Sequence, residues 1–247
     1  ANNEVGTIQP LDEVAALVAE RAPRAVLHTD AVQAAPWLDL VAGTAAVPLV
    51  AVSAHKFGGP KGVGVLVVRQ GTRLVPVIDG GGQERDLRSG THNVAGIVGM
   101  GAALAVTVER RGEEVPRVAA LRDRLAAGIA AAVPGARFNG DPARKLPNNC
   151  HVSFPGVESE ALLLLLDREG ICAAAGSSCA SGALDPSHVL AAMGVPRDVA
   201  RASLRLSLGW PTTEAEIDEI LAILPGAIEK LRPLAAGGRP VRSRTPG

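Results

Sequence analysis

A buried strand that runs into a lysine constrains this chain more than any other segment. Residues 49–52 form a short apolar run that is followed at once by Ser53, His55 and Lys56. A Gly-Gly-Pro turn comes next, and a second apolar run, residues 63–68, is predicted to return into the core. Buried strands bounded by turn residues are typical of parallel or mixed sheets. Because ligands in open α/β sheets bind beyond the carboxyl ends of strands, Lys56 lies at a candidate binding site.

The residues around Lys56 favour a chemical role over an ordinary one. A lone lysine beside a turn is usually a solvated surface residue. Lysine is scarce in this chain, however, and Ser53 and His55 offer a hydroxyl and an imidazole suited to an anion. A lysine held at a strand end is expected to be partly desolvated, which favours the neutral amine. A neutral amine attacks carbonyl carbons to form a Schiff base.

The composition limits the class of protein. The 247 residues are 47% hydrophobic and 20% charged, which predicts a globular chain with one large or two ordinary domains. The formal net charge of +0 gives no basis for a nucleic-acid or anionic-membrane partner. No signal peptide or membrane-spanning run is recognised and the Cys count of 3 forms no disulfide framework, so a reduced, cytoplasmic location is expected. No CxxC or HExxH pattern occurs, so no resident metal is predicted.

Changes in residue pattern predict two domains and a tail. Residues 1–111 alternate strands and connections in the manner of βαβ units and end in a helix over residues 94–111. Residues 112–232 are predicted to form a smaller α/β domain whose first helix covers about residues 115–133. Residues 233–247 are rich in Gly, Pro and Arg and are expected to be a disordered tail.

Several local patterns add detail. Residues 73–93 are Gly-rich and polar, and a loop of that length inside a compact domain is usually functional or disordered. Thr213 with Glu216 has the spacing of a capping box, which predicts the start of the last helix. Cys150 and Cys172 lie in apolar strand contexts and are predicted to be buried.

Seven segments of the chain, taken in order, resemble the cysteine desulfurases, the NifS/IscS-like branch of the class V aminotransferases. The similarity runs from Asn2 to about Leu231. The segments are NNEVGTIQP, HTDAVQA, SAHKFGGPKGVG, GGGQERDLRSGTHNVAGIVG, LPNNCHVSFPGVESEALLLLLD, AAGSSCASGALDPSHVLAAMG and LRLSLGWPTTEAEID.

The resemblance implies an α/β chain of the pyridoxal-phosphate-dependent transferase fold type I. The remnant of a large, mostly parallel sheet domain is expected first, followed by a smaller C-terminal α/β domain. In the family a long segment precedes the first of these motifs and carries a phosphate-binding loop and a ring-stacking histidine. The chain is therefore expected to be the C-terminal part of such a protein.

The resemblance also assigns a pyridoxal 5'-phosphate site. Lys56 matches the lysine that binds the cofactor as a Schiff base and removes the substrate proton. Ser53 and His55 match contacts to the cofactor phosphate. Asp30 matches the carboxylate that holds the ring nitrogen. A carboxylate at a strand end suits that role, although an isolated aspartate there is more often a cap or turn residue.

Three further positions match cofactor contacts. Gln33 and Asn3 match residues that contact the ring hydroxyl. Thr91 matches a threonine that reaches the phosphate in the neighbouring subunit's site, which implies a homodimer with shared active sites. Without the resemblance, Asn3 and Thr91 are ordinary turn residues.

Arg205 is the candidate residue for substrate binding, and Cys179 is the candidate residue for sulfur chemistry. Arg205 lies in an apolar strand, where a buried arginine needs an anionic partner. A substrate carboxylate or a structural ion pair would satisfy it, and the resemblance assigns it to the carboxylate of L-cysteine. Cys179 lies in a loop of small, polar residues, where a thiol is free to react. The resemblance assigns it the attack on the substrate sulfur, and a transient role as an iron–sulfur cluster ligand stays open.

The implied activity is the conversion of L-cysteine to L-alanine with a persulfide on Cys179. The sulfur then passes to an acceptor protein, either an iron–sulfur scaffold or a tRNA-thiolation protein. Two alternatives stay open. One is a related pyridoxal phosphate enzyme of the same fold, such as a selenocysteine lyase or an aminotransferase. The other is a remnant without activity of its own.

Overall fold

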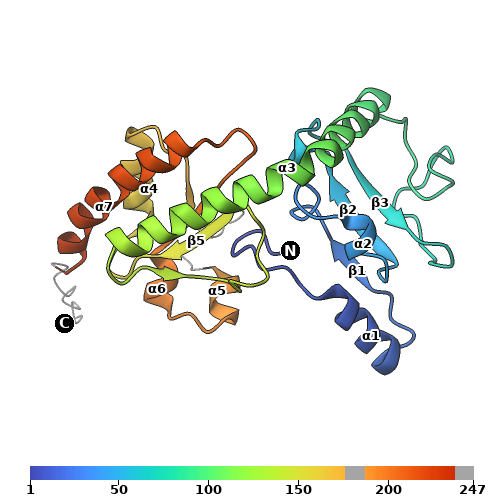
Figure 1. Cartoon of the computed structure of the whole chain (residues 1–247). Helices are drawn as coiled ribbons and strands as arrows, with labels where there is room; N and C mark the ends of the chain where they lie inside the picture. The colour runs from blue at the N-terminus through green and yellow to red at the C-terminus, as the bar shows by residue number, and fades with distance from the viewer. Residues whose placement is uncertain (176–186, 237–247) are drawn as a thin grey trace, which may run out of the picture. The chain divides into compact units, whose positions relative to one another are not determined.

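The computed structural model describes residues 1–175 and 187–236, and the chain divides into two compact units (Figure 1). The first unit holds Ala1 and Ile8–Val115, and the second holds Asn2–Thr7 and the chain from Pro116 onwards. Asn2–Thr7, which the sequence analysis assigns to the first domain, groups with the second unit.

The first unit carries a small mixed sheet. Its strands are β1 (His28–Asp30), β2 (Leu49–Ser53) and β3 (Gly64–Val68), in the spatial order β1-β2-β3. β1 is parallel to β2, as the βαβ pattern predicts, and β3 is antiparallel to β2. The helices of this part of the unit are α1 (Leu11–Arg21) and α2 (Leu40–Gly43).

The connection from β2 to β3 is a hairpin that contains the predicted Gly-Gly-Pro turn, so these two strands do not continue the predicted βαβ pattern. Only the 3-10 helix η1 (Ala54–Phe57) and a tight turn separate the two strands, and this is too short for a parallel connection. Gly58 has a φ of 80°, which favours glycine, and a Cβ on Gly59 would lie 2.8 Å from the Cβ of Ala54. The Gly-Gly pair is therefore what lets the chain reverse directly after Lys56.

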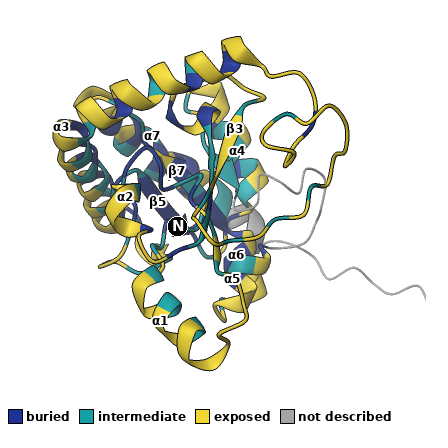
Figure 2. Cartoon of the chain, turned by 90° about the vertical axis from the view of Figure 1, so that its right-hand side faces the viewer, coloured by how far each residue is buried: buried dark blue, intermediate teal, exposed yellow. Residues whose placement is uncertain are grey.

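The prediction that β3 returns into the core is wrong. Val65, Leu66 and Val67 are 47%, 44% and 44% exposed. Among the described residues β3 pairs with β2 alone, so it forms an edge of the sheet. Figure 2 shows this strand as exposed, in contrast to β5 and β7 of the second unit.

Helix α3 (Val94–Ala132) is continuous, where the sequence analysis predicts two helices that meet near Gly112. Pro116 lies inside the helix, where a proline costs about 3 kcal/mol. Packing on both sides offsets this cost. The first half buries Met100 in the core of the first unit. The second half buries residues at helical spacing in the second unit, each worth about 1.5–3 kcal/mol: Val118, Leu121, Leu125 and Ile129.

The second unit is built on a four-stranded antiparallel sheet in the order β4-β5-β7-β6. All five residues of β5 are buried, so both of its faces are covered. The strands are β4 (Arg137–Phe138), β5 (Asn149–Ser153), β6 (Ala174–Ala175) and β7 (Ser203–Ser207). The helices besides α3 are α4 (Ser159–Arg168), α5 (His188–Ala192), α6 (Arg197–Arg201) and α7 (Glu214–Ala236).

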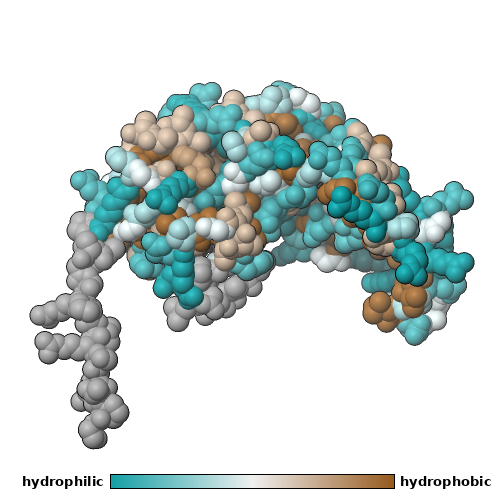
Figure 3. Space-filling view, turned by 90° about the horizontal axis from the view of Figure 1, so that it is seen from below, coloured by the Kyte–Doolittle hydropathy of each residue, from teal (hydrophilic) through white to brown (hydrophobic). Residues whose placement is uncertain are grey.

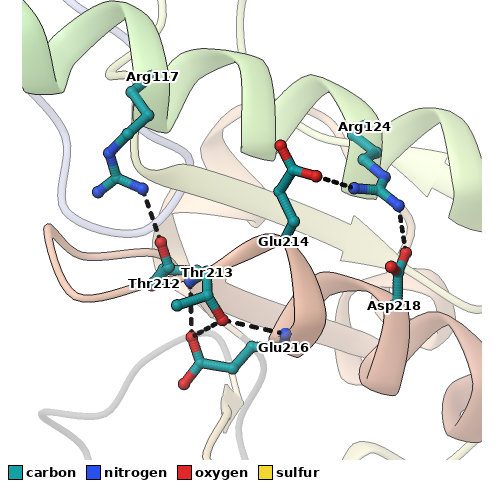
Figure 4. Close-up of polar contacts among 7 residues, drawn as sticks. All are labelled: Arg117, Arg124, Thr212, Thr213, Glu214, Glu216 and Asp218. Atoms are coloured by element: carbon teal, nitrogen blue, oxygen red, sulfur yellow. Dashed lines mark hydrogen bonds and ion pairs between the residues drawn. The ribbon is translucent and has the colours of Figure 1, made fainter.

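The last helix begins as predicted and ends later than predicted. Thr213 and Glu216 form the capping box, with Glu216 Oε2 2.7 Å from the Thr213 nitrogen and Thr213 Oγ1 3.3 Å from the Glu216 nitrogen (Figure 4). Helix α7 runs to Ala236, which is beyond residue 233, where the tail is predicted to start. Residues 237–247 lie outside the described part of the chain.

No helix in the described ranges is long and apolar enough to cross a membrane. Apolar side chains nevertheless reach the surface in several places on the face drawn in Figure 3. Besides β3, the first half of α3 carries such residues, among them Val94 at 64% and Val98 at 66% exposed.

Two arginines of α3 hold the start of α7 (Figure 4). Arg117 donates through Nη1 to the carbonyl oxygen of Thr212 at 2.7 Å and through Nη2 to that of Trp210. Arg124 pairs with Glu214 at 3.3 Å and with Asp218. The two arginines differ in their surroundings, because the Arg117 bonds are partly buried and the Arg124 side chain is 43% exposed.

Replacing Arg117 with alanine is expected to lower the free energy of unfolding by about 1–3 kcal/mol, because partly buried carbonyls lose charged donors. Replacing Arg124 with alanine is expected to cost less than about 1 kcal/mol, since exposed ion pairs contribute little. Urea unfolding followed by circular dichroism measures both changes. Equal losses for the two variants would contradict a special role for the Arg117 contacts.

Candidate functional site

The carboxyl ends of β1 and β2 bring predicted cofactor residues to one edge of the first unit's sheet. The two strands are parallel, with Asp30 opposite Ala51, so both end at this edge. Asp30 is the last residue of β1 and Ser53 the last of β2. His55 and Lys56 follow directly in η1. A carboxylate, a hydroxyl, an imidazole and an amine therefore gather where ligands of α/β sheets bind.

Local hydrogen bonds order this edge. The Oγ of Ser53 lies 2.7 Å from Nδ1 of His55. The Oδ1 of Asp30 accepts from the Val32 nitrogen at 2.9 Å, which fixes the carboxylate at the start of the turn that also contains Gln33. Lys56 is exposed, so the expected partial desolvation is wrong for the part of the chain described here. The reason is its place on η1, after the strand has left the core.

The groups at this edge fit pyridoxal phosphate in kind. A phosphate needs hydrogen-bond donors, which the Ser53–His55 pair offers. A protonated pyridine nitrogen needs a carboxylate such as Asp30. An aldehyde needs an amine such as that of Lys56. Each of these three requirements is met by a residue from the carboxyl end of β1 or β2.

Thr91 lies apart from this group in the connection between β3 and α3. The connection folds on itself, since Gln83 Oε1 accepts from the Gly90 nitrogen at 2.9 Å and the Ser89 nitrogen donates to the Ile78 carbonyl at 3.3 Å. Among the described residues, no hydrogen bond joins Thr91 to the other predicted cofactor residues. Its role toward a neighbouring subunit stays a prediction.

In the second unit, two predicted site residues are hydrogen-bonded to each other. Arg205 on β7 donates through Nη1 to the backbone oxygen of Asn3 at 2.9 Å. β7 lies between β5 and β6, and Arg205 is opposite His151 on one side and Ala174 on the other. Cys179, the predicted sulfur-carrying residue, lies outside the described residues.

The comparisons with known proteins identify the family. The profile of the family described as "Aminotransferase class-V" matches residues 1–220. The chain belongs to the class-V aminotransferase family. A curated relative, "Cysteine desulfurase IscS" of Clostridium botulinum (strain Hall), is 47% identical over 237 residues, which are 95% of this chain and 59% of that protein. The chain thus spans about three fifths of the length of this relative.

Solved structures of the same family confirm the predicted fold class. A protein described as "NIFS-LIKE PROTEIN" matches with a TM-score of 0.84 and 39% identity, and covers 94% of this chain and 60% of its own. A structure described as "SspA in complex with cysteine" matches with a TM-score of 0.65 and 30% identity over 84% of this chain and 56% of its own. The α/β chain of fold type I and the resemblance to NifS/IscS proteins are both confirmed.

Two buried polar residues of this class-V chain, Glu4 and Ser187, were not predicted from the sequence. Glu4 is 3% exposed and its Oε2 accepts from the Oγ of Ser187 at 2.5 Å. Ser187 also accepts from the nitrogens of Val189 and Leu190, so it caps α5. A serine directly before an apolar helical segment is a cap signal that the sequence contains. No sequence pattern shows that Glu4 is its partner, because the two residues lie 183 positions apart.

The two described cysteines, Cys150 and Cys172, differ in burial, and Cys150 lies on β5 beside the strand that carries Arg205. Burial raises the pKa of the Cys150 thiol to about 11, so this cysteine is protonated and inert, as predicted for a core residue. Cys172 is exposed, and the prediction that it is buried is wrong, because it precedes β6 in an irregular segment. Among the described residues, no group of three or more His, Cys, Asp or Glu is placed to hold a metal ion.

His151 is fully buried on β5. Burial and, to a smaller extent, repulsion by Lys145 and Arg205 together lower the pKa of its imidazole to about 4. Its Nδ1 lies 3.0 Å from Nδ2 of Asn139, and no described residue hydrogen-bonds to its Nε2. The folded protein therefore holds this imidazole neutral.

We expect the free energy of unfolding to fall as the pH drops from about 6.5 to about 4. In this range the unfolded chain takes up a proton on His151 that the folded chain does not, so protonation favours unfolding. The loss amounts to about 3 kcal/mol, and it is absent above pH 6.5 because both states are then neutral. Urea unfolding of the parent and of His151→Asn at several pH values measures it. The variant is expected to show a shallower pH dependence, and identical slopes would contradict the assignment.

Proposed function

We propose that the chain carries the cofactor and substrate residues of a cysteine desulfurase that uses pyridoxal 5'-phosphate. The observation that carries this proposal is the edge formed by β1 and β2, where Asp30, Ser53, His55 and Lys56 gather. The names of the relatives support the reaction class. Because the chain spans 59% of the first of them, the activity of the whole protein is proposed and not read from the comparison.

The residues at this edge would hold the cofactor in three places. Ser53 and His55 would donate to its phosphate, and Asp30 would accept from its ring nitrogen. The amine of Lys56 would hold its aldehyde. Gln33 and Asn3 are proposed to contact the ring hydroxyl. When bound, the cofactor supplies an electron sink for the bonds at the substrate Cα.

Arg205 and Lys56 prepare the substrate. Arg205 holds the carboxylate of L-cysteine through the planar fork of its guanidinium, and Lys56 takes the proton from Cα. The hydrogen bond from Arg205 Nη1 to the Asn3 carbonyl fixes the guanidinium within the second unit. The substrate is therefore oriented by a group whose own position is set by the backbone.

Cys179 is proposed to take the sulfur. Its thiolate attacks the substrate sulfur, a sulfur–sulfur bond forms, and the carbon–sulfur bond breaks with its electron pair on the carbon. The Cβ carbon takes up a proton, Lys56 returns to Cα the proton that it removed, and L-alanine leaves, so L-cysteine and the thiol together give L-alanine and a persulfide. The persulfide sulfur then passes to an acceptor protein, an iron–sulfur scaffold or a tRNA-thiolation protein. Thr91 is proposed to serve the site of a second copy, in a homodimer.

The test is to incubate the chain with pyridoxal phosphate and L-cysteine and to measure L-alanine and the persulfide by mass spectrometry. We expect a mass gain of one sulfur on Cys179 and none in Cys179→Ser. The matched control is Cys172→Ser, which removes the exposed cysteine before β6 and is expected to leave the yield unchanged. A keto acid instead of alanine, or full sulfide release by Cys179→Ser, would contradict the proposal.

A further inference from the structure

One face of the second unit's sheet is polar and buried. Along β5, Asn149, His151 and Ser153 alternate with apolar residues, so their side chains lie on the same face. These three residues are 4%, 0% and 0% exposed, and Ser203 of β7, on the same face, is 2% exposed. Buried polar groups cost free energy unless they are hydrogen-bonded. A polar face at this position therefore indicates a role besides core packing.

Arg205 lies on this face, directly opposite His151 in the pairing of β5 with β7. Directly opposite residues of antiparallel strands have Cβ atoms about 4.5–5.5 Å apart. The two side chains also interact electrostatically, because repulsion by Arg205 is one of the causes, after burial and Lys145, that lower the pKa of the imidazole. The ring therefore lies beside the Arg205 side chain and adds no second charge there.

The ring of His151 is held in one orientation by Asn139. The Nδ1 atom lies 3.0 Å from Nδ2 of Asn139, and an amide nitrogen only donates, so Nδ1 accepts and the proton of the neutral ring is on Nε2. Asn139 is itself fixed, since its Nδ2 donates to Ser153 Oγ at 2.9 Å and its carbonyl accepts from Lys145 Nζ at 2.9 Å. Its backbone nitrogen donates to the His151 carbonyl at 3.0 Å, so Asn139 lies on the side of β5 away from β7.

The bond to Asn139 leaves the other edge of the ring toward Arg205. The two nitrogens lie on different sides of the imidazole, so with Nδ1 toward Asn139 the Nε2 edge faces away from β4, and the strand on that side is β7. No described residue hydrogen-bonds to Nε2, so the effect of this edge comes from its shape. At its far end, Arg205 is held by its bond to the Asn3 carbonyl at 2.9 Å. Arg205 thus has a rigid ring beside it and a backbone acceptor at its end.

We propose that His151 is a positioning residue: its buried ring fixes the direction in which the Arg205 guanidinium meets the substrate carboxylate. This inference rests on the proposed function of Arg205. A guanidinium binds a carboxylate through two parallel hydrogen bonds only when the two groups are aligned. Without the ring, the flexible side chain of Arg205 samples more directions, and the aligned one is populated less.

The experiment compares His151→Val with His151→Phe. Both residues suit a buried strand and both remove the ring nitrogens, but only phenylalanine keeps a flat ring beside Arg205. We expect His151→Val to raise KM for L-cysteine about 10-fold with kcat changed less than about twofold, the effect of one misaligned charged hydrogen bond. His151→Phe is expected to keep KM near that of the parent. With cysteamine, which lacks the carboxylate, both variants should resemble the parent.

The matched control is Ser153→Ala. Ser153 lies on the same buried face and accepts from the same Asn139 amide, but it is opposite Ser203 and not Arg205. We expect this variant to lower the free energy of unfolding, measured with urea, and to leave KM for L-cysteine unchanged. A loss of stability by itself is therefore not expected to reproduce the effect of His151→Val.

A second readout needs neither cofactor nor turnover. Phenylglyoxal modifies accessible guanidinium groups, and mass spectrometry of the peptide that contains Arg205 gives the rate of modification. We expect this rate to be about 3- to 10-fold higher in His151→Val than in the parent, since the guanidinium leaves the Asn3 carbonyl more often. The rates in His151→Phe and Ser153→Ala are expected to stay near that of the parent.

The outcomes separate this inference from the proposed function. If the parent forms no L-alanine from L-cysteine, the proposed function is wrong, and the modification rates of Arg205 still test the ring contact. If the parent is active, a His151→Val variant with the KM or the modification rate of the parent overturns the role of His151 alone. Equal changes in His151→Val and His151→Phe would show that the ring itself does not position Arg205 and would also overturn it.

Discussion

Lys56→Ala is expected to lose cofactor attachment and to lower L-alanine formation by at least about 10³-fold. The variant removes the amine that is proposed to bind the aldehyde and to take the Cα proton, and a single positioned base contributes about 10²–10⁴-fold. Lys56 lies on η1, and its side chain is exposed, so little packing is lost. The change is therefore expected to affect chemistry and to leave the free energy of unfolding nearly unchanged.

Lys61→Ala is the matched control for this prediction, since Lys61 lies in the same hairpin connection and is also exposed. Absorbance after addition of pyridoxal phosphate and borohydride trapping followed by mass spectrometry measure attachment. Trapping on Lys61, or equal trapping on parent and Lys56→Ala, would contradict the assignment of Lys56.

Arg205→Lys is expected to lower kcat/KM for L-cysteine about 10²-fold, mostly through a higher KM. Lysine keeps the charge but cannot grip a carboxylate with two parallel bonds, and the loss of one partner in such a pair costs about 2–5 kcal/mol. Lysine also reaches the Asn3 carbonyl less well than the guanidinium, which donates to it at 2.9 Å. Steady-state kinetics with L-cysteine as the varied substrate gives both parameters.

The control for Arg205→Lys is a substrate that lacks the carboxylate. Cysteamine offers the same amine and thiol, so the parent and the variant should differ little with it. A variant that loses cysteamine turnover as strongly as cysteine turnover would indicate a general structural defect. A KM for L-cysteine equal to that of the parent would show that another residue binds the carboxylate.

Local sequence patterns predicted the parts of the fold that depend on neighbours in the chain. The apolar run before Lys56 is β2, and Thr213 with Glu216 caps α7. The patterns failed where distant packing decides the outcome. The change of pattern near Gly112 indicates a helix boundary, but α3 continues because each of its halves buries apolar residues. Similarly, the composition of β3 indicates burial, whereas pairing on one side leaves it exposed.

The same distinction holds for the candidate site. Ser53, His55 and Lys56 were predictable because they lie within four positions of each other at the end of one strand. Asp30 joins them through the parallel pairing of β1 and β2, which the strand–connection–strand pattern indicates. The contact between Asn3 and Arg205 spans 202 positions, and its geometry follows only from the sheet of the second unit. Resemblance named both residues, but it did not show that one holds the other.

The order in which the chain passes through its two units limits how the second unit can be expressed separately. The second unit is discontinuous, because Asn2–Thr7 belongs to it while Ile8–Val115 does not. Val5 from this short stretch is 2% exposed in a core cluster with Leu190 and Ala200. A fragment that starts at Pro116 would open a cavity there and leave the Asn149 amide without its Glu4 acceptor. A version of the second unit that folds independently needs Asn2–Thr7 joined to it, either through an added linker or by circular permutation.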